Sequence, residues 1–380
     1  MASSPDQKKR VFLVVTVLCF AVAVLYTLFS ARSAHRESSE KIASPQPQAA
    51  QAPPAPEAAA PETTKEKQPA RELQAKAPAN PPKVAAPAEK LSKSINSKGR
   101  LVALNMRDSP NLGKVEYAPL NEIEPDHRTA VDLRCERVYF AAGEGICLRR
   151  EVHILTAQTV ATVVDANFQP RFTIRNDGIP SRARISPDGR YAAFTVFLTG
   201  HSYGDAQLAT ATLLVDMQHG TTVANLEDFQ VLQDGNVIKS PDFNYWGVTF
   251  QRDSNFFYAT LRTKGVNYLV HGDIKARTIT VIYKGVECPS LSPDGKRLAF
   301  KKLISRNNWR LTLLDLATLQ ETPLAETRSV DDQAEWLDNH HVLYAIVDGA
   351  PWMSVMVVPS DGTGQPEIFA KGATSPAIVR

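Results

Sequence analysis

Short segments of alternating apolar and polar residues recur along the chain from about residue 97 onward, and each is introduced by a turn. The clearest unit runs from Ser292 to Phe300 with the sequence Ser-Pro-Asp-Gly-Lys-Arg-Leu-Ala-Phe, and the unit from Ser186 to Phe194 repeats it as Ser-Pro-Asp-Gly-Arg-Tyr-Ala-Ala-Phe. Proline fits the second position of a type I turn, and glycine supplies the positive φ that follows. The alternating residues after each turn predict a strand, so each unit predicts a β-hairpin.

Weaker copies of this hairpin keep the same spacing between the turn and the end of the strand. The strands that follow the turns end near Leu104, Leu148, Phe194, Tyr258, Phe300 and Tyr344. A repeat of about forty residues with four short strands is typical of a propeller blade. No long amphipathic helical segment interrupts the pattern. The sequence therefore predicts an all-β fold, a six-bladed β-propeller of four-stranded antiparallel blades, over residues 97–380.

The two ends of this region complement each other. The unit that begins at Lys98 has no strand before it to serve as the first strand of its blade. The segment Ser375 to Val379 resembles Cys288 to Ser292, the expected first strand of the fifth blade. We therefore expect residues 375–380 to form the first strand of blade one, which would close the ring and remove its open edge.

The N-terminal part has a different pattern. Val11 to Ser30 is an almost unbroken apolar run, long enough as a helix to span a hydrocarbon core of roughly 30 Å. Lys8 to Arg10 precede it and favour a cytoplasmic N-terminus. The small residues near Ala31 leave a cleaved signal peptide as the alternative, although the run is longer than a usual signal core. We expect a cytoplasmic tail at 1–10 and a transmembrane signal anchor at 11–30, and either interpretation exports the rest.

Residues 31–96 are rich in proline and alanine and poor in large apolar residues. Such a segment cannot bury enough apolar surface to offset the entropy of ordering, so we expect a disordered linker. Its prolines favour an extended spacer over a compact coil.

The Ser-Pro-Asp-Gly hairpins followed by a Leu-Ala-Phe type strand resemble those of the TolB-like family of six-bladed propellers, which has WD40-like repeats. The resemblance covers residues 97–380. It implies a non-enzymatic binding or scaffold module on the extracytoplasmic side of the membrane, with an envelope or cell-surface protein as its partner. The chain differs from TolB in its expected anchor and linker, and it shows no separate α/β domain before the propeller. Related blades also occur in the gating domains of prolyl peptidases.

An exported propeller enzyme, a hydrolase or lyase with its site at the central channel, is the alternative function. Charged groups converging on the channel mouth would favour the enzyme, and an apolar or plugged channel would favour the binding module. The formal net charge of +3 is far from that of a nucleic-acid binder. We expect no cofactor and no metal site, because the histidines are scattered and the adjacent His340 and His341 would point to opposite faces of a strand. Asp188, Asp294 and Asp361 are interpreted as turn caps, since no calcium-binding motif surrounds them.

Two local motifs remain. Gly200 to Gly204 matches the G-x-S-x-G nucleophile elbow, but strands flank it on both sides, so we interpret it as a surface loop. Cys135 and Cys147 are expected to face each other across the first hairpin of blade two, at a spacing close to that of a disulfide. The disulfide would leave Cys288 unpaired, and two buried, reduced cysteines are the alternative. The tryptophans are interpreted as packing residues: Trp246, Trp309, Trp336 and Trp352.

The interval between Phe194 and Tyr258 is about twenty residues longer than the repeat requires. The extra residues fall at 199–207 and 227–244, in loops that open onto the same face of the propeller. We expect these loops to form one raised patch that contacts the partner, although a tolerated surface insertion would explain them equally well. The predicted contact residues are His201, Tyr203, Asp205, Asp228, Asp234, Lys239 and Tyr245.

Overall fold

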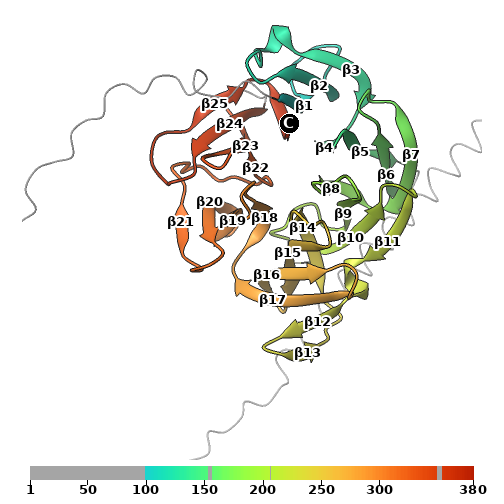
Figure 1. Ribbon diagram of the computed structural model, residues 1–380, viewed down its shortest axis with the longest axis vertical. Helices are drawn as coiled ribbons and strands as arrows, with labels where there is room; N and C mark the ends of the chain where they lie inside the picture. Colours follow the sequence, from blue (N-terminus) through green and yellow to red (C-terminus); the bar gives the residue numbers. More distant parts are fainter. Residues whose placement is uncertain (1–98, 153–155, 206, 349–352) are drawn as a thin grey trace, which may run out of the picture. The chain divides into compact units, whose positions relative to one another are not determined.

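The computed structural model describes residues 99–380, apart from 153–155, 206 and 349–352. The expected tail, membrane anchor and linker lie outside the described residues. No helix in the described part of the chain is long and apolar enough to cross a membrane. The described strands form six sheets that follow one another around a ring (Figure 1). The predicted all-β, six-bladed propeller of antiparallel blades is confirmed.

The strands of each blade lie in order from the propeller axis outward. Blade one contains β26 (Ala373–Val379), β1 (Arg100–Asn105), β2 (Lys114–Pro119) and β3 (Thr129–Arg134). Blade two contains β4 (Arg137–Ala141), β5 (Glu144–Val152), β6 (Ala157–Val164) and β7 (Pro170–Asp177). Blade three contains β8 (Ile179–Ile185), β9 (Tyr191–Thr199), β10 (Ala209–Asp216) and β11 (Thr221–Asn225).

The second half of the ring follows the same order. Blade four contains β14 (Asn244–Phe250), β15 (Phe256–Thr263), β16 (Val266–Asp273) and β17 (Thr278–Lys284), extended by β12 (Gln230–Gln233) and β13 (Asn236–Ile238). Blade five contains β18 (Glu287–Leu291), β19 (Arg297–Ser305), β20 (Asn308–Asp315) and β21 (Glu321–Pro323). Blade six contains β22 (Glu335–Trp336), β23 (His341–Val347), β24 (Met353–Pro359) and β25 (Glu367–Ala370). Single turns of 3₁₀ helix lie at η2 (Pro125–His127) and η3 (Leu226–Asp228).

The Ser-Pro-Asp-Gly turns join the first and second strands of blades three and five. In blade three, Ser186 donates its hydroxyl hydrogen bond to Asp188 at 2.7 Å, and the Tyr191 N–H donates to the Ser186 hydroxyl at 2.9 Å. Gly189 takes φ +74°, in the left-handed region that favours glycine. The unit beginning at Ser292 repeats these bonds. The aspartates therefore cap the turns and fix the hairpins.

The C-terminal strand closes the ring. β26 pairs antiparallel with β1, with Leu101 opposite Ile378 and Arg100 opposite Val379. The strand covers 373–379, so it starts two residues earlier than the predicted 375–380. Ser375 and Cys288 both take a positive φ, at +51° and +48°, and each precedes a proline. The two innermost strands thus share a local backbone irregularity, which agrees with their sequence resemblance.

The second predicted insertion takes a form that the repeat pattern did not indicate. β12 pairs in parallel with β17, and β13 returns beside β12 through a turn at Asp234 and Gly235, both with positive φ. Residues 230–238 therefore widen the outer edge of blade four and do not form a loop raised above one face. The prediction of a raised loop was wrong because the pairing of β12 with β17 is non-local and leaves no spacing signal.

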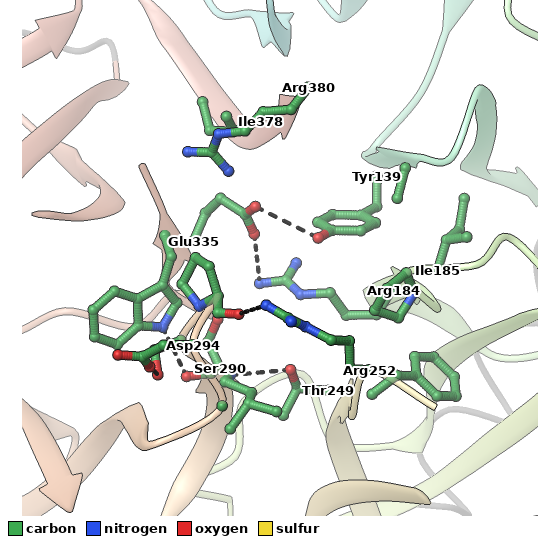
Figure 2. A pocket seen from close by; sticks show the side chains of 18 residues that line it. Tyr139, Arg184, Ile185, Thr249, Arg252, Ser290, Asp294, Glu335, Ile378 and Arg380 are labelled. Carbon is green, nitrogen blue, oxygen red and sulfur yellow. Dashed lines mark hydrogen bonds and ion pairs between the residues drawn. The ribbon is translucent and has the colours of Figure 1, made fainter. Parts of the chain in front are cut away.

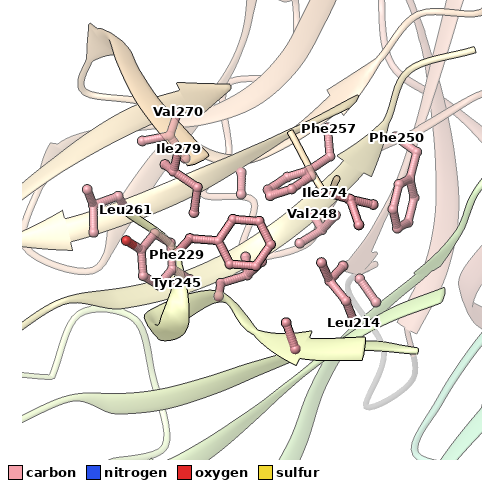
Figure 3. Packing of buried hydrophobic residues seen from close by; sticks show 14 of the residues in the cluster. Leu214, Phe229, Tyr245, Val248, Phe250, Phe257, Leu261, Val270, Ile274 and Ile279 are labelled. Atoms are coloured by element: carbon pink, nitrogen blue, oxygen red, sulfur yellow. The ribbon is translucent and has the colours of Figure 1, made fainter. Parts of the chain in front are cut away.

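Apolar layers between neighbouring blades make up the core. Figure 3 shows the largest of these layers, in which Tyr245 packs beside Phe229, Leu261 and Ile279. Tyr245 is only 1% exposed, so its predicted role as a surface contact is wrong. It lies within β14, and its side chain points into the layer between blades three and four. Trp246, Trp309 and Trp336 are also buried, as predicted for packing residues, whereas Trp352 lies outside the described residues.

A disulfide joins Cys135 and Cys147, with an S–S distance of 2.06 Å and a Cα–Cα distance of 5.5 Å. The two cysteines do not occupy opposite positions of the β4–β5 hairpin, as the sequence had suggested. Cys135 lies in the connection between β3 and β4, and the residue opposite Cys147 in the hairpin is Val138. The bond therefore ties the link between blades one and two to the second strand of blade two. Cys288 is a free cysteine and is buried.

We expect deletion of residues 375–380 to destabilise the whole propeller. The truncation would expose the inner edge of β1 and remove the buried side chains of Ala377 and Ile378, a loss of at least about 3 kcal/mol in the free energy of unfolding. Thermal unfolding followed by circular dichroism measures the effect, with deletion of the exposed Arg380 alone as the control. An unchanged midpoint in the six-residue truncation would contradict the proposed importance of ring closure.

Candidate functional site

A cavity of about 440 Å³ opens at the centre of the ring, on the face that carries the Ser-Pro-Asp-Gly turns. We call it the channel-mouth cavity (Figure 2). Its walls come from the innermost strand of every blade, because the first strands converge on the propeller axis. The residues that represent blades one to six in order are Ile378, Tyr139, Arg184, Thr249, Ser290 and Glu335.

An ion pair joins two blades across this cavity. Arg184 of β8 lies 3.5 Å from the Glu335 carboxylate of β22, and it also donates to the Ala334 carbonyl at 2.6 Å. The Arg184 guanidinium lies over the Tyr139 ring at 4.4 Å, and the Tyr139 hydroxyl donates to Glu335 at 3.5 Å. Burial raises the pKa of Glu335, and the charge of Arg184 only partly offsets that effect.

The rim of the cavity is more exposed and polar. Arg252 donates to the Pro293 carbonyl at 3.0 Å from an exposed position, and Asp294 and Arg380 lie on the same rim. Trp336 forms part of the wall and donates its indole N–H to the Ser290 carbonyl at 2.9 Å. The rim therefore offers unburied charges of both signs above an apolar and aromatic wall.

The channel narrows sharply below Arg184. A cavity of only about 20 Å³ lies among Arg137, Arg182, Gln333 and their neighbours. Arg137 donates to the Ser181 carbonyl at 2.8 Å, and Gln333 donates to the Val248 and Pro289 carbonyls at 3.1 and 2.9 Å. These bonds tie the innermost strands together and leave room for little more than a water molecule.

Charged and aromatic side chains fill the opposite end of the channel. Lys301, which is fully buried, donates to Asp331, and Arg182 lies 3.6 Å from the same carboxylate. Burial alone would raise the pKa of Asp331, but these two cations hold it below its ordinary value. Lys301 also lies 4.5 Å from the centre of the Trp309 ring and 4.9 Å from that of Tyr203.

Tyr203 covers this end of the innermost strands. It was predicted to be an exposed contact residue, and that prediction is wrong because its side chain is buried. It is 3% exposed, stacks on Trp246 with ring centres 4.6 Å apart, and shares a hydrogen bond with the Ser181 hydroxyl. Its carbonyl accepts a hydrogen bond from Arg262 at 2.9 Å. The loop after β9 thus folds inward across blades three to five, because its aromatic ring finds both apolar walls and cations there.

The remaining predicted contact residues lie in two separate places. His201 is exposed on the loop after β9, and Asp205 accepts hydrogen bonds from the N–H groups of His201 and Ser202 at 2.7 and 3.0 Å. Asp228, Asp234 and Lys239 are found in and beside the β12–β13 extension. Three strands of blade four, β17, β16 and β15, separate that extension from β14, the innermost strand on which Tyr203 packs. The two segments therefore do not form the single raised patch that the sequence suggested.

The G-x-S-x-G segment connects two antiparallel strands, β9 and β10. The Ser202 hydroxyl accepts a hydrogen bond from the Gly204 N–H at 3.3 Å, and Asp205 closes the loop through backbone groups. The context of a nucleophile elbow is a strand followed by a helix. Among the described residues, no group of three or more His, Cys, Asp or Glu is placed to hold a metal ion.

Charged groups do converge on the channel, which on its own would favour an enzyme. Nearly all of them bind one another or backbone carbonyls, however: Arg184 with Glu335, and Lys301 and Arg182 with Asp331. The lower channel is also filled. The arrangement therefore suits a rigid binding surface better than a site with a free acid, base or nucleophile. The sequence indicated the central channel as a possible site but none of its lining residues, because they come one or two at a time from six distant repeats.

We expect Tyr203→Ala to destabilise the propeller by about 3–4 kcal/mol, because it empties a buried aromatic site. His201→Ala, two residues earlier in the same loop, should change stability by no more than about 0.5 kcal/mol. Urea unfolding of both variants measures the difference. Equal, small effects would mean that the loop lies on the surface and that Tyr203 does not cover the channel.

No family model matches the chain, and no curated protein matches it. Solved structures share its fold. TolB from Acinetobacter baumannii matches with a TM-score of 0.53 and 15% identity, over 75% of this chain and 67% of that one. A chain of a nidogen/laminin complex matches with a TM-score of 0.50 and 12% identity, over 74% of this chain and 97% of that one. Together with the ring closure and the blade topology, these similarities show that the described region is a six-bladed propeller of the TolB-like fold.

Proposed function

We propose that the chain is a non-enzymatic protein-binding propeller that receives a segment of its partner in the channel-mouth cavity. The observation that carries the proposal is the cavity itself, which all six blades line and which lies open at the axis. Its volume of about 440 Å³ falls within the range of ordinary ligand pockets. The aromatic wall of Trp336 and the charged rim give the combination of apolar contact and polar orientation that recognition requires.

The fold supports this proposal by analogy only. One structure of similar fold comes from a nidogen/laminin complex, which shows that a chain of this fold occurs in a protein–protein assembly. The paired charges and filled lower channel argue for the same function from the chain's own residues, because a blind cavity with a rigid floor is suited to holding an inserted side chain or loop.

The test is capture of the partner by variants of the cavity rim. We expect Arg252→Glu combined with Arg380→Glu to weaken capture from the native cell envelope by at least about tenfold, because the rim charges orient the incoming segment. Lys275→Glu, which reverses an exposed cation in the turn between β16 and β17 and away from the cavity lining, is the matched control and should capture normally. A photo-crosslinker at Asp294 should also label the partner.

The segments 199–207 and 227–244, which the sequence analysis proposed as the partner-binding loops, provide the alternative outcome of this test. If loss of capture follows His201→Ala or Asp234→Ala and not the rim variants, the partner binds at those loops and the channel-mouth proposal fails.

We also propose that the propeller lies on the extracytoplasmic side of a membrane, with an envelope or cell-surface protein as its partner. The basic residues Lys8 to Arg10 before the apolar run support this orientation. The Cys135–Cys147 disulfide is compatible with an oxidising compartment.

We expect a reporter fused after Arg380 to be active only when the reporter is one that works outside the cytoplasm. Paired fusions to alkaline phosphatase and to a fluorescent protein that matures only in the cytoplasm provide the measurement. Phosphatase silence together with cytoplasmic fluorescence would overturn the proposed location.

A further inference from the structure

Exposed apolar side chains gather at equivalent positions of five blades. They lie at the end of the second strand or in the turn from the second to the third strand. The residues and their exposed fractions are Leu112 at 37%, Val152 at 76%, Leu198 at 48%, Leu303 at 46%, Ile304 at 58% and Val347 at 58%. The other exposed large apolar residues are scattered over outer strands and other turns.

The propeller geometry places these positions on one face. Every second strand runs the same way along the axis, so all the turns that follow second strands lie at the end of the channel opposite the channel-mouth cavity. We call this surface the second-strand face. The opposite face has polar turns such as Asp188-Gly189 and Asp294-Gly295, and none of these six exposed apolar side chains lies on it.

Basic residues accompany the apolar ones on the second-strand face. Lys264 lies at the tip of blade four, which has no exposed large apolar residue there, and Arg306 follows Leu303 and Ile304 in blade five. Neither cation has a carboxylate within ion-pair distance among the described residues. The turns that follow the second strands hold three basic and three acidic residues: Arg107, Lys264 and Arg306, and Asp108, Asp205 and Asp348. The adjoining ends of the second strands add four basic residues and one acidic residue: Arg149, Arg150, Arg262 and Lys302, and Glu151.

We propose that the second-strand face rests on the surface of an anionic lipid bilayer. The apolar tips come from five of the six blades and are spread around this face. Shallow insertion of Leu303 and Ile304 would bury apolar surface while Lys264 and Arg306 meet lipid phosphates. Tyr203 fills the channel at this end. The cavity between blades six and one is lined chiefly by charged residues, among them Arg107, Asp126, Asp348 and Lys371.

The N-terminal segment is long enough for this placement. The chain enters β1 on the face opposite the second-strand face. Residues 31–96 could span roughly 200 Å when extended, which is more than enough to pass the side of the propeller and reach the same bilayer. The contact therefore leaves the channel-mouth cavity turned away from the lipid and accessible to a partner.

The experiment measures the distance of each face from the lipid in the full-length protein. A fluorophore is attached at Ile304→Cys or, as the opposite-face control, at Arg190→Cys, in a Cys19→Ser background in which Cys288 is buried. The protein is reconstituted into vesicles that contain brominated lipids as quenchers, either in pure phosphatidylcholine or with added phosphatidylglycerol. We expect quenching at residue 304 to exceed that at residue 190, and to increase with phosphatidylglycerol.

Substitutions at residues that carry no fluorophore separate the apolar from the charged contribution to the lipid contact. Lys264→Gln and Arg306→Gln should each weaken the contact by roughly fivefold. Leu303→Ser with Ile304→Ser should reduce the quenching of a label at Leu198→Cys. Ile368→Ser removes a side chain on the outer strand of blade six that is about as exposed as Leu303. This control should leave the quenching of the label at residue 198 unchanged.

Equal quenching at residues 304 and 190, or quenching at 304 that is insensitive to phosphatidylglycerol, would overturn the proposal. A second-strand face that serves a protein partner instead would give no quenching with vesicles alone.

Discussion

The pairing of β26 with β1 is the constraint on which the rest of the structure depends. It joins residues from the two ends of the described chain, so that Leu101 and Ile378 lie side by side in one sheet. The candidate site depends on the same strand, because Ile378 also forms part of the wall of the channel-mouth cavity. The cavity is therefore a property of the closed ring, and no single blade or pair of blades could form it.

The channel performs different roles along its length. At the mouth, Arg184 and Glu335 link opposite sides of the ring at a loose 3.5 Å and leave open space above them. At the other end, Lys301 and Asp331 lie among aromatic rings. Cations buried in this way remain tolerable because each has a carboxylate, carbonyl or ring partner. Mutual pairing holds the blades in register, and it leaves selection of a ligand to the exposed rim.

Local turn chemistry made most of the fold predictable. The Ser-Pro-Asp-Gly turns and their spacing locate the second strand of each blade, and the resemblance of Ser375 to Val379 to a first strand locates the closure. Two features could not be predicted from the sequence, because they depend on contacts between residues far apart in the chain. Tyr203 belongs to a glycine-rich loop that looks exposed, and only the Trp246 ring and Lys301 across the channel bring it inside. The parallel pairing of β12 with β17 likewise has no counterpart in the repeat.

The disulfide has a mechanical consequence. A force applied through the N-terminal segment would act first on β1 and could unravel the chain through β2 and β3, which lie between the point of entry and Cys135. There the covalent bond to Cys147 would carry the load into the second strand of blade two, and further extension would have to pull on that blade as a unit. The disulfide would thus confine force-induced unfolding to blade one, the blade that follows the N-terminal segment.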